Sequence, residues 1–278
     1  AITTNCLVVF DEAHQSVAPT YKKLTEDLLF VPPKALLGLS ATPGRTWADI
    51  DEDRKVAEMY MEEKVSLEVE GWDNPVSYLM SEGYLSQPTF ETLHADPGMT
   101  IGDEDRAAIA AGLELDAAVV HQLSMSHQYL AAVLSAVLKL VNEGHTRVLV
   151  FAASVEHAKC IAGLVQSKKI TARVVLGETS AQARTQAITK FKGSSEDPMI
   201  LVNFGVLTTG FDAPKVTAAV IARPTASLVL YSQMVGRAIR GPKAGGTSEC
   251  KIVTVVDPGL EGFGDVAAAF KNWEDVWG

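Results

Sequence analysis

Short apolar runs alternate with helical stretches from Arg147 onward, and this alternation restricts the possible fold more than any other feature. Regular alternation of this kind favours a parallel sheet with helices on both faces. Strands are predicted at 148–152, 172–176, 199–202, 216–222 and 251–255, with helices at 155–166, 180–191 and 228–240. Two earlier apolar runs, at 7–10 and 36–39, predict further buried strands. We therefore expect an α/β fold with two parallel-sheet domains, the first of them incomplete.

Composition and charge argue against a membrane protein, a secreted protein and a protein that binds nucleic acid through its overall charge. The chain has 278 residues, 47% hydrophobic and 21% charged, which is typical of a globular protein with room for two domains. A net charge of −10 argues against nucleic-acid binding through overall charge, although a local groove is still compatible with it. We expect no membrane span and no signal peptide. Three widely spaced cysteines, none in a CxxC pair, indicate reduced thiols in a cytoplasmic protein.

An acidic pair follows the first apolar run directly. Leu7 to Phe10 lead into Asp11 and Glu12, with His14 two residues further on. The C-terminal end of a parallel strand is where α/β sheets place their ligands. There, one carboxylate can hold a hydrated Mg²⁺ and the other can orient a water molecule. Taken alone, the pair is also compatible with a solvated acidic turn after a core strand.

A second polar group lies near the end of the predicted helix 228–240. Arg237 and Arg240 are three residues apart, so on a helix they would face the same side and point at one target. Guanidinium groups match phosphate oxygens with forked donors and keep their charge. Gly236 allows close approach just before them. A solvated basic patch at a helix end is the alternative interpretation.

Four segments, in their order along the chain, resemble motifs II, III, V and VI of superfamily 2 helicases and translocases of the DEAH type. They are residues 7–14, 36–45, 210–212 and 233–240. Each motif is short, but the ordered set is specific and covers roughly the whole chain. The resemblance implies two RecA-like domains: residues 1–95 with motifs II and III, a connection at 96–123, and residues 124–278 with motifs IV, V and VI. The C-terminal part, from about residue 124, is expected to be the more stable unit.

The resemblance also implies ATP and Mg²⁺ as cofactors and gives each residue a role. Asp11 would hold the metal through water, Glu12 would position the attacking water, and Arg237 and Arg240 would act as arginine fingers. His14 would link the nucleotide site to the second domain through Gln233. The acidic and guanidinium pairs would then converge across a shared cleft. Further implied roles are nucleotide binding at Gly210 and Asp212, coupling at Ser40 and Thr42, and nucleic-acid contact at Ser154, Gly177, Thr208 and Thr209.

Simpler interpretations remain for two of these segments. Ser154 is also a good N-cap for the helix that follows it. The Gly- and Thr-rich stretch 204–214 is also compatible with a plain connection between a strand and a helix.

The sequence contains no GxxxxGK[ST] loop, which in this family precedes the Asp-Glu strand and grips the β- and γ-phosphates. Together with the abrupt start, this leads us to expect an N-terminally truncated chain that hydrolyses little ATP by itself. The expected function is the C-terminal portion of an ATP-dependent DNA or RNA helicase or translocase. Motif VI opens with Gln rather than His, which favours the group containing restriction-enzyme motor subunits and repair translocases, and hence DNA.

Expected partners are nucleic acid and other subunits of a restriction, defence or repair complex. The alternative is a non-catalytic, helicase-like module that grips nucleic acid or a partner without turnover. A Rossmann-type metabolic enzyme is disfavoured because no GxGxxG follows any predicted strand.

Overall fold

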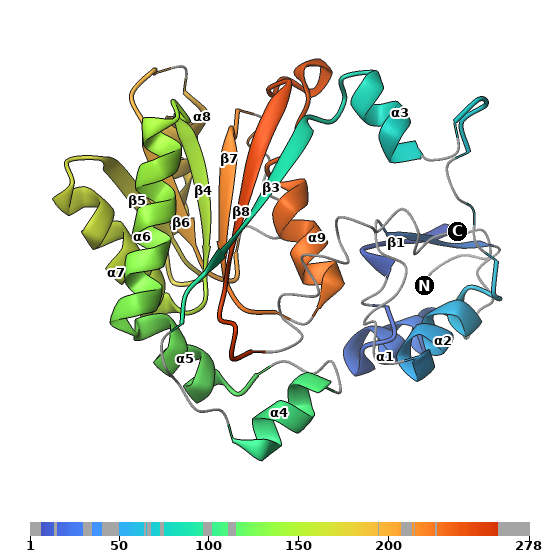
Figure 1. Cartoon of the computed structure of the whole chain (residues 1–278). Helices are drawn as coiled ribbons and strands as arrows, with labels where there is room; N and C mark the ends of the chain where they lie inside the picture. Colours follow the sequence, from blue (N-terminus) through green and yellow to red (C-terminus); the bar gives the residue numbers. More distant parts are fainter. Residues whose placement is uncertain are drawn as a thin grey trace. The chain divides into compact units, whose positions relative to one another are not determined.

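The computed structural model describes residues 7–13, 16–29, 35–40, 50–63, 65, 68–72, 75–96, 102–110, 115–193, 195–206, 213, 215–225 and 227–260. Figure 1 shows the elements that they form. The chain divides into two units, Ala1–Leu67 and Glu68–Gly278. Residues 261–278 lie outside the described residues.

The first unit contains a parallel pair of strands and two helices. Strand β1 (Leu7–Asp11) pairs with β2 (Ala35–Leu39), so that Asp11 lies opposite Leu39. Helices α1 (Pro19–Leu29) and α2 (Ile50–Met59) complete the described elements of this unit. Both early strands form as predicted, but the expectation that they are buried is wrong, because their residues alternate between exposed and half-buried.

Gly38 allows the chain to pack closely beside this strand pair. A Cβ atom at this position would lie 2.6 Å from the ring of Tyr60 and 2.8 Å from the Cβ atom of Ala13. Both distances are shorter than van der Waals contact, so a side chain at residue 38 would displace the ring or the residues that follow Asp11 and Glu12. Glycine at residue 38 thus leaves the space that the Tyr60 ring and Ala13 occupy.

The second unit contains a six-stranded sheet in the order β3-β8-β7-β4-β6-β5, with every neighbouring pair parallel. Its strands are β3 (Gln87–His94), β4 (Arg147–Ala152), β5 (Thr171–Val175), β6 (Met199–Asn203), β7 (Ala218–Ala222) and β8 (Glu249–Val256). Its helices are α3 (Pro75–Ser81), α4 (Asp103–Ala110), α5 (Ala117–Met125), α6 (His127–Asn142), α7 (Val155–Ser167), α8 (Ala181–Lys192), α9 (Leu228–Gly236) and the 3-10 turn η2 (Pro242–Ala244). The predicted parallel α/β fold is confirmed.

Helices cover both faces of this sheet (Figure 1). Every residue of β4, β6 and β7 is buried, as expected for central strands with two covered faces. Side chains along β4 alternate: Val148 and Val150 join the core beneath α6 and α7, whereas Leu149 and Phe151 join the core beneath α8 and α9. The continuous apolar runs in the sequence therefore supply two cores, one on each face.

The division between the units falls earlier than the predicted boundary at residue 95. Strand β3 pairs with β8 along all eight of its residues, so 87–94 belongs to the second unit. Leu115 and Leu123, in the segment predicted as a connection, are buried in the core beneath α6 and α7. The sequence of 87–94 does not indicate which sheet the strand joins, because its pairing partner lies about 160 residues further along the chain.

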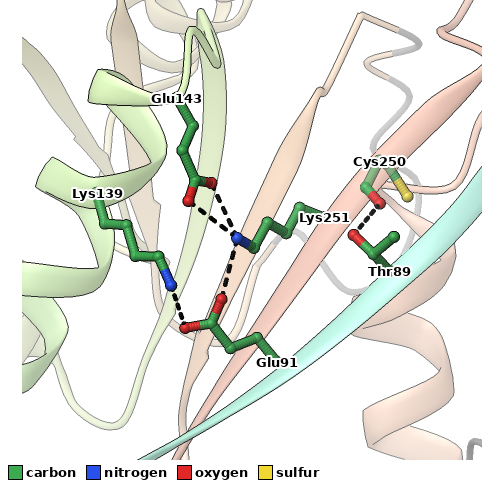
Figure 2. A network of polar contacts seen from close by, with 6 residues as sticks. All are labelled: Thr89, Glu91, Lys139, Glu143, Cys250 and Lys251. Atoms are coloured by element: carbon green, nitrogen blue, oxygen red, sulfur yellow. Dashed lines mark hydrogen bonds and ion pairs between the residues drawn. The ribbon is translucent and has the colours of Figure 1, made fainter.

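An ion-pair network fastens β3 to the rest of the sheet and to α6 (Figure 2). The Lys251 ammonium, on β8, lies 3.0 Å from a Glu91 carboxylate oxygen and 2.9 Å from one of Glu143. Lys139, on α6, lies 2.6 Å from the other Glu91 oxygen. Hydrogen bonds from the two ammonium groups, Lys139 first, lower the pKa of the Glu91 carboxyl. The network therefore holds the edge strand at a point where helix and sheet meet.

Among the residues that the structure describes, no helix combines the length and the apolar character that crossing a membrane requires.

Candidate nucleotide and nucleic-acid sites

The acidic pair lies where β1 ends. Asp11 is the last residue of β1, and its side chain is exposed. Glu12 follows in a turn with φ of 56°, a left-handed conformation that non-glycine residues rarely adopt, and its backbone N–H donates to Asp11 Oδ1 at 3.1 Å. Uncommon backbone conformations of this kind concentrate at functional sites. The turn places two consecutive acidic residues at the ligand-binding edge of a parallel sheet.

Ser40 belongs to the same edge. It directly follows β2, and the last pair of the β1–β2 register joins Asp11 to Leu39. Ser40 is therefore one residue beyond the partner of Asp11, and it is half-buried. The other two residues predicted for this region, His14 and Thr42, lie outside the described residues.

The carboxylates at this turn suit Mg²⁺ in chemical type, because magnesium prefers oxygen ligands and is usually held by one or two carboxylates, waters and substrate phosphates. No group of three or more His, Cys, Asp or Glu side chains that could form a metal cage occurs among the described residues. The donor set thus fits an ion shared with a bound nucleotide.

In the second unit, Ser154 stands just past the end of β4 and caps helix α7. Its hydroxyl oxygen accepts from the His157 backbone N–H at 3.0 Å. Next to it, the Ala153 N–H donates to Nδ1 of the same histidine at 3.1 Å. The structure thus bears out the capping interpretation of Ser154, and the nucleic-acid role of Ser154 stays a prediction.

Gly177 lies in the turn after β5, at the same edge of the sheet. The Thr179 hydroxyl accepts from the Leu176 N–H at 2.8 Å, and the Arg184 guanidinium donates to the Leu176 carbonyl at 3.0 Å. Strands β5, β6 and β4 are neighbouring and parallel, so their carboxyl ends lie at one edge of the sheet. That edge therefore carries Gly177 after β5, the residues after Asn203 at the end of β6, and Ser154 after β4. The predicted residues Thr208, Thr209, Gly210 and Asp212 lie outside the described residues.

Arg223 is a residue at this edge that the sequence analysis did not single out. It directly follows β7, and its guanidinium carbon lies 5.4 Å from the centre of the Phe204 ring, beyond the end of β6. A narrow recess beside it is lined in part by Thr225, Tyr231 and Asp257. Burial raises the pKa of the Asp257 carboxyl, which accepts from the Gly259 N–H at 2.8 Å. A basic residue directly after an apolar strand is the signal that would have identified Arg223.

Helix α9 ends at Gly236, four residues before the end of the predicted helix 228–240. Arg237 is the C-cap residue, and Arg240 lies in an extended bridge with Leu85. The expectation that both arginines share one helix face is therefore wrong. The bridge to Leu85 and the tight approach at Gly241 favour extended backbone over a further turn of helix. Gln233, on α9, and both arginines are half-buried.

The sheet order, the crossovers and the polar groups at the carboxyl edge define an α/β protein with a RecA-like sheet. Two solved structures share this fold. One is a candidate HsdR subunit of a type I restriction enzyme from Vibrio vulnificus, with a TM-score of 0.59 and 17% identity, over 97% of this chain and 51% of that one. The other is the Hef helicase domain of Pyrococcus furiosus, with a TM-score of 0.53 and 14% identity, over 95% and 73%.

Two family models match the chain, in the order of the two units. Residues 2–45 match the res subunit of type III restriction enzymes, and residues 131–242 match the helicase conserved C-terminal domain. The first match contains the acidic pair and the second contains both arginines. The two matches support the resemblance to superfamily 2 helicases and to the motors of restriction enzymes.

Two relatives of known name match most of the chain. The chain is 24% identical to a candidate ATP-dependent helicase, IRC3, of Saccharomyces cerevisiae, over 84% of this chain and 32% of that protein. It is 27% identical to a 51.5 kDa protein of a Lactococcus phage, over 84% and 46%. The chain thus spans about a third of the length of the first relative and just under half of the second.

Proposed function

We propose that this chain couples ATP hydrolysis to movement on nucleic acid, as part of a helicase or translocase. The observation that carries the proposal is the ordered pair of family matches, each of which contains one of the two polar groups. The match at 2–45 includes Asp11 and Glu12, and the match at 131–242 includes Arg237 and Arg240.

In this proposal the acidic pair handles the metal and the attacking water. Asp11 holds Mg²⁺ through water, and Glu12 orients the water that attacks the γ-phosphate. When bound, the metal neutralises negative charge on the phosphates. The position of the two carboxylates at the end of β1, with Ser40 beside them, supports this assignment.

The two arginines stabilise the charge that develops on the phosphates. Gln233, on α9, forms part of the nucleotide site together with His14, Gly210 and Asp212. Gln233, Arg237 and Arg240 are half-buried, which supports this role, because a phosphate contact needs a side chain that is held by its surroundings yet reaches solvent.

Nucleic acid then lies along the carboxyl edge of the six-stranded sheet, at Ser154, Gly177, Thr208 and Thr209, and Thr42 and Ser40 couple it to the nucleotide. DNA is the preferred polymer, because motif VI opens with Gln233 and the chain resembles restriction-enzyme motors. Other subunits of a restriction, defence or repair complex are the proposed protein partners.

The test is ATP hydrolysis by the longest natural polypeptide that contains these residues, with and without nucleic acid. Duplex DNA, single-stranded DNA and single-stranded RNA of equal length are compared. We expect DNA to stimulate hydrolysis most. We also expect Glu12→Gln and Arg237→Ala to lower kcat at least about 100-fold. The matched controls are Glu63→Gln and Arg173→Ala, because both residues are exposed and belong to neither polar group.

Loss of hydrolysis in the two site variants but not in the controls supports the proposal. If all variants bind nucleic acid equally well and none hydrolyses ATP, the protein is instead a non-catalytic binding module. If the protein neither binds nucleic acid nor hydrolyses ATP, the motor assignment is wrong.

A further inference from the structure

The segment 82–87, which connects α3 to β3, lies against the residues that follow α9. Leu85 and Arg240 form an antiparallel bridge. Three backbone hydrogen bonds extend it: Ser86 N–H to Ile239 O at 3.0 Å, Gly241 N–H to Tyr84 O at 2.9 Å, and Lys243 N–H to Gly83 O at 2.9 Å. Residues separated by about 155 positions in the sequence are thus joined strand to strand beside Arg240.

The Ser86 side chain binds the backbone of Arg240 directly. Ser86 is fully buried, and its hydroxyl lies 2.7 Å from the Arg240 carbonyl oxygen and 2.8 Å from that of Thr247. The Thr247 N–H donates to the same Arg240 carbonyl at 3.0 Å. The Arg240 carbonyl therefore accepts from the Thr247 N–H and shares the single Ser86 hydroxyl proton with the Thr247 carbonyl, which fixes the point from which the arginine side chain extends.

Gly241 sets how closely the two segments approach. A Cβ atom on this residue would lie 2.3 Å from the Gly83 carbonyl oxygen and 2.8 Å from the carbonyl carbon of Leu85. Both contacts are with backbone, which cannot rotate away as a side chain can. Any residue larger than glycine would therefore push the segment 82–87 away from Arg240 and Gly241.

Lys243 makes two further, more exposed contacts with the segment 82–87. Its ammonium lies 2.6 Å from the Glu82 carboxylate and 5.0 Å from the centre of the Tyr84 ring. Both side chains of the ion pair are about half exposed, so this contact adds less than the buried hydroxyl does.

We propose that Ser86 and Gly241 are positioning residues for Arg240. Because α9 ends at Gly236, the helix does not hold Arg240, and the backbone of this residue is held instead by the segment 82–87. An arginine that stabilises a transition state needs its guanidinium at one position, and a shift of about 1 Å can cost two orders of magnitude in rate. The inference rests on the proposed role of Arg240 at the phosphates.

The experiment is a double-mutant cycle on nucleic-acid-stimulated ATP hydrolysis by the longest natural polypeptide that contains the chain. The variants are Ser86→Ala, Arg240→Ala and the two combined. For Ser86→Ala we expect kcat to fall roughly 3- to 10-fold, with KM for ATP within about two-fold of wild type. The combined variant should be no slower than Arg240→Ala, because Ser86 acts only through that arginine.

Further measurements separate positioning from general loss of structure. Nucleic-acid affinity and thermal midpoint are measured for every variant, and Ser86→Ala should leave the affinity unchanged. Ser86→Cys keeps a side chain of similar shape with a weaker donor, so it should give an intermediate kcat and replaces Ser86→Ala if that variant does not fold. Gly241→Ala should lower kcat, whereas Gly163→Ala, at a site with open space around the glycine, should not.

Three outcomes overturn the inference. Wild-type kcat in Ser86→Ala, while Arg240→Ala is slow, removes the positioning role and leaves the proposed function intact. Losses that multiply in the combined variant make Ser86 a structural residue only. Full activity in Arg240→Ala refutes the role of the arginine itself, and the inference falls with it.

Discussion

At the scale of single residues, Arg147 is a buried charge held without a carboxylate. The side chain is 3% exposed, and its guanidinium donates to five backbone carbonyls. These belong to Thr146, Phe191, Gly193, Ser195 and Asp197, at 2.6 to 2.9 Å. Five donors therefore meet five acceptors, and the arginine holds the connection between α8 and β6 against the start of β4.

Replacing this side chain should lower the stability of the folded protein. In Arg147→Met, one buried and four partly buried carbonyls lose the guanidinium donor, and we expect the free energy of unfolding to fall by about 3 kcal/mol or more. Urea denaturation followed by circular dichroism measures the change. The control is Arg173→Met, at a more exposed position with a single carbonyl contact, which should change the stability by less than about 1 kcal/mol. Equal effects of the two substitutions would contradict this account.

His157 gives the fold a pH dependence. It is fully buried, and burial lowers the pKa of its imidazole from 6.5 to about 4. The unfolded chain therefore binds a proton below pH 6.5, whereas the folded protein does not until about pH 4. The stability that this residue contributes is complete above pH 6.5, falls as the pH drops toward 4, and then levels off.

In His157→Gln this part of the pH dependence should disappear. Between pH 6.5 and 4, the unfolding free energy of wild type should fall relative to the variant by roughly 1 kcal/mol per pH unit. Urea midpoints at half-unit steps of pH measure the difference. His127→Gln, at an exposed position, serves as the control and should follow the wild-type curve. Parallel curves for wild type and His157→Gln would show that the histidine titrates normally.

At the scale of elements, the network at Glu91 joins strand β3 to β8 and α6. Lys251 is 20% exposed and contacts two carboxylates, whereas Lys139 is 50% exposed and contacts one. A lysine with less solvent around it and more partners contributes more, because screening weakens exposed pairs.

We therefore expect Lys251→Met to lower the unfolding free energy by about 1 kcal/mol at low salt, and Lys139→Met by less than half as much. In 1 M NaCl the difference between the two variants should shrink. Guanidinium is itself a salt, so urea is the denaturant for this comparison. A larger effect of Lys139→Met would mean that the burial of the two lysines does not govern their contribution.

The end of α9 shows how an element boundary escapes sequence analysis. The stretch 228–240 contains no proline, and its apolar residues recur with helical spacing. Its last four residues nevertheless leave the helix, because Arg240 pairs with Leu85 and Gly241 packs against Gly83. Both partners lie more than 150 residues away in the sequence, so local propensity could not reveal them.

At the scale of the whole molecule, the position of β3 determines which fragment should fold. The predicted second domain starts at residue 124 and would lack β3, which pairs with β8 along eight residues. Without it, β8 becomes an open edge, and an unpaired edge strand is a template for self-association. In the structure the second unit instead starts at Glu68 and therefore includes β3.

We expect residues 68–278 to unfold cooperatively as a monomer, and residues 124–278 to self-associate and to unfold at a lower urea concentration. Sedimentation velocity and urea denaturation of the two fragments test this. A monomeric fragment 124–278 with the midpoint of the longer one would show that β3 adds nothing to the stability of the sheet.

The sequence by itself determined the elements and the class of the fold. Continuous apolar runs such as 148–152 and 199–202 can be satisfied only by strands buried on both faces, so a parallel α/β sheet followed from them. It also placed Asp11 and Glu12 at the end of a strand, because an apolar run of strand length stops at these two charged residues. Those predictions depend only on contacts between near neighbours in the chain.

Tertiary structure decided the rest. The sheet that β3 joins, the end of α9 and the support of Arg240 by Ser86 all depend on contacts between residues that are distant in sequence. Ser86 is a single serine with no pattern around it, and only its burial against the Arg240 carbonyl distinguishes it. The local pattern of residues predicts whether a segment forms a helix or a strand. Which distant partner stabilises that segment is settled only when the whole chain packs.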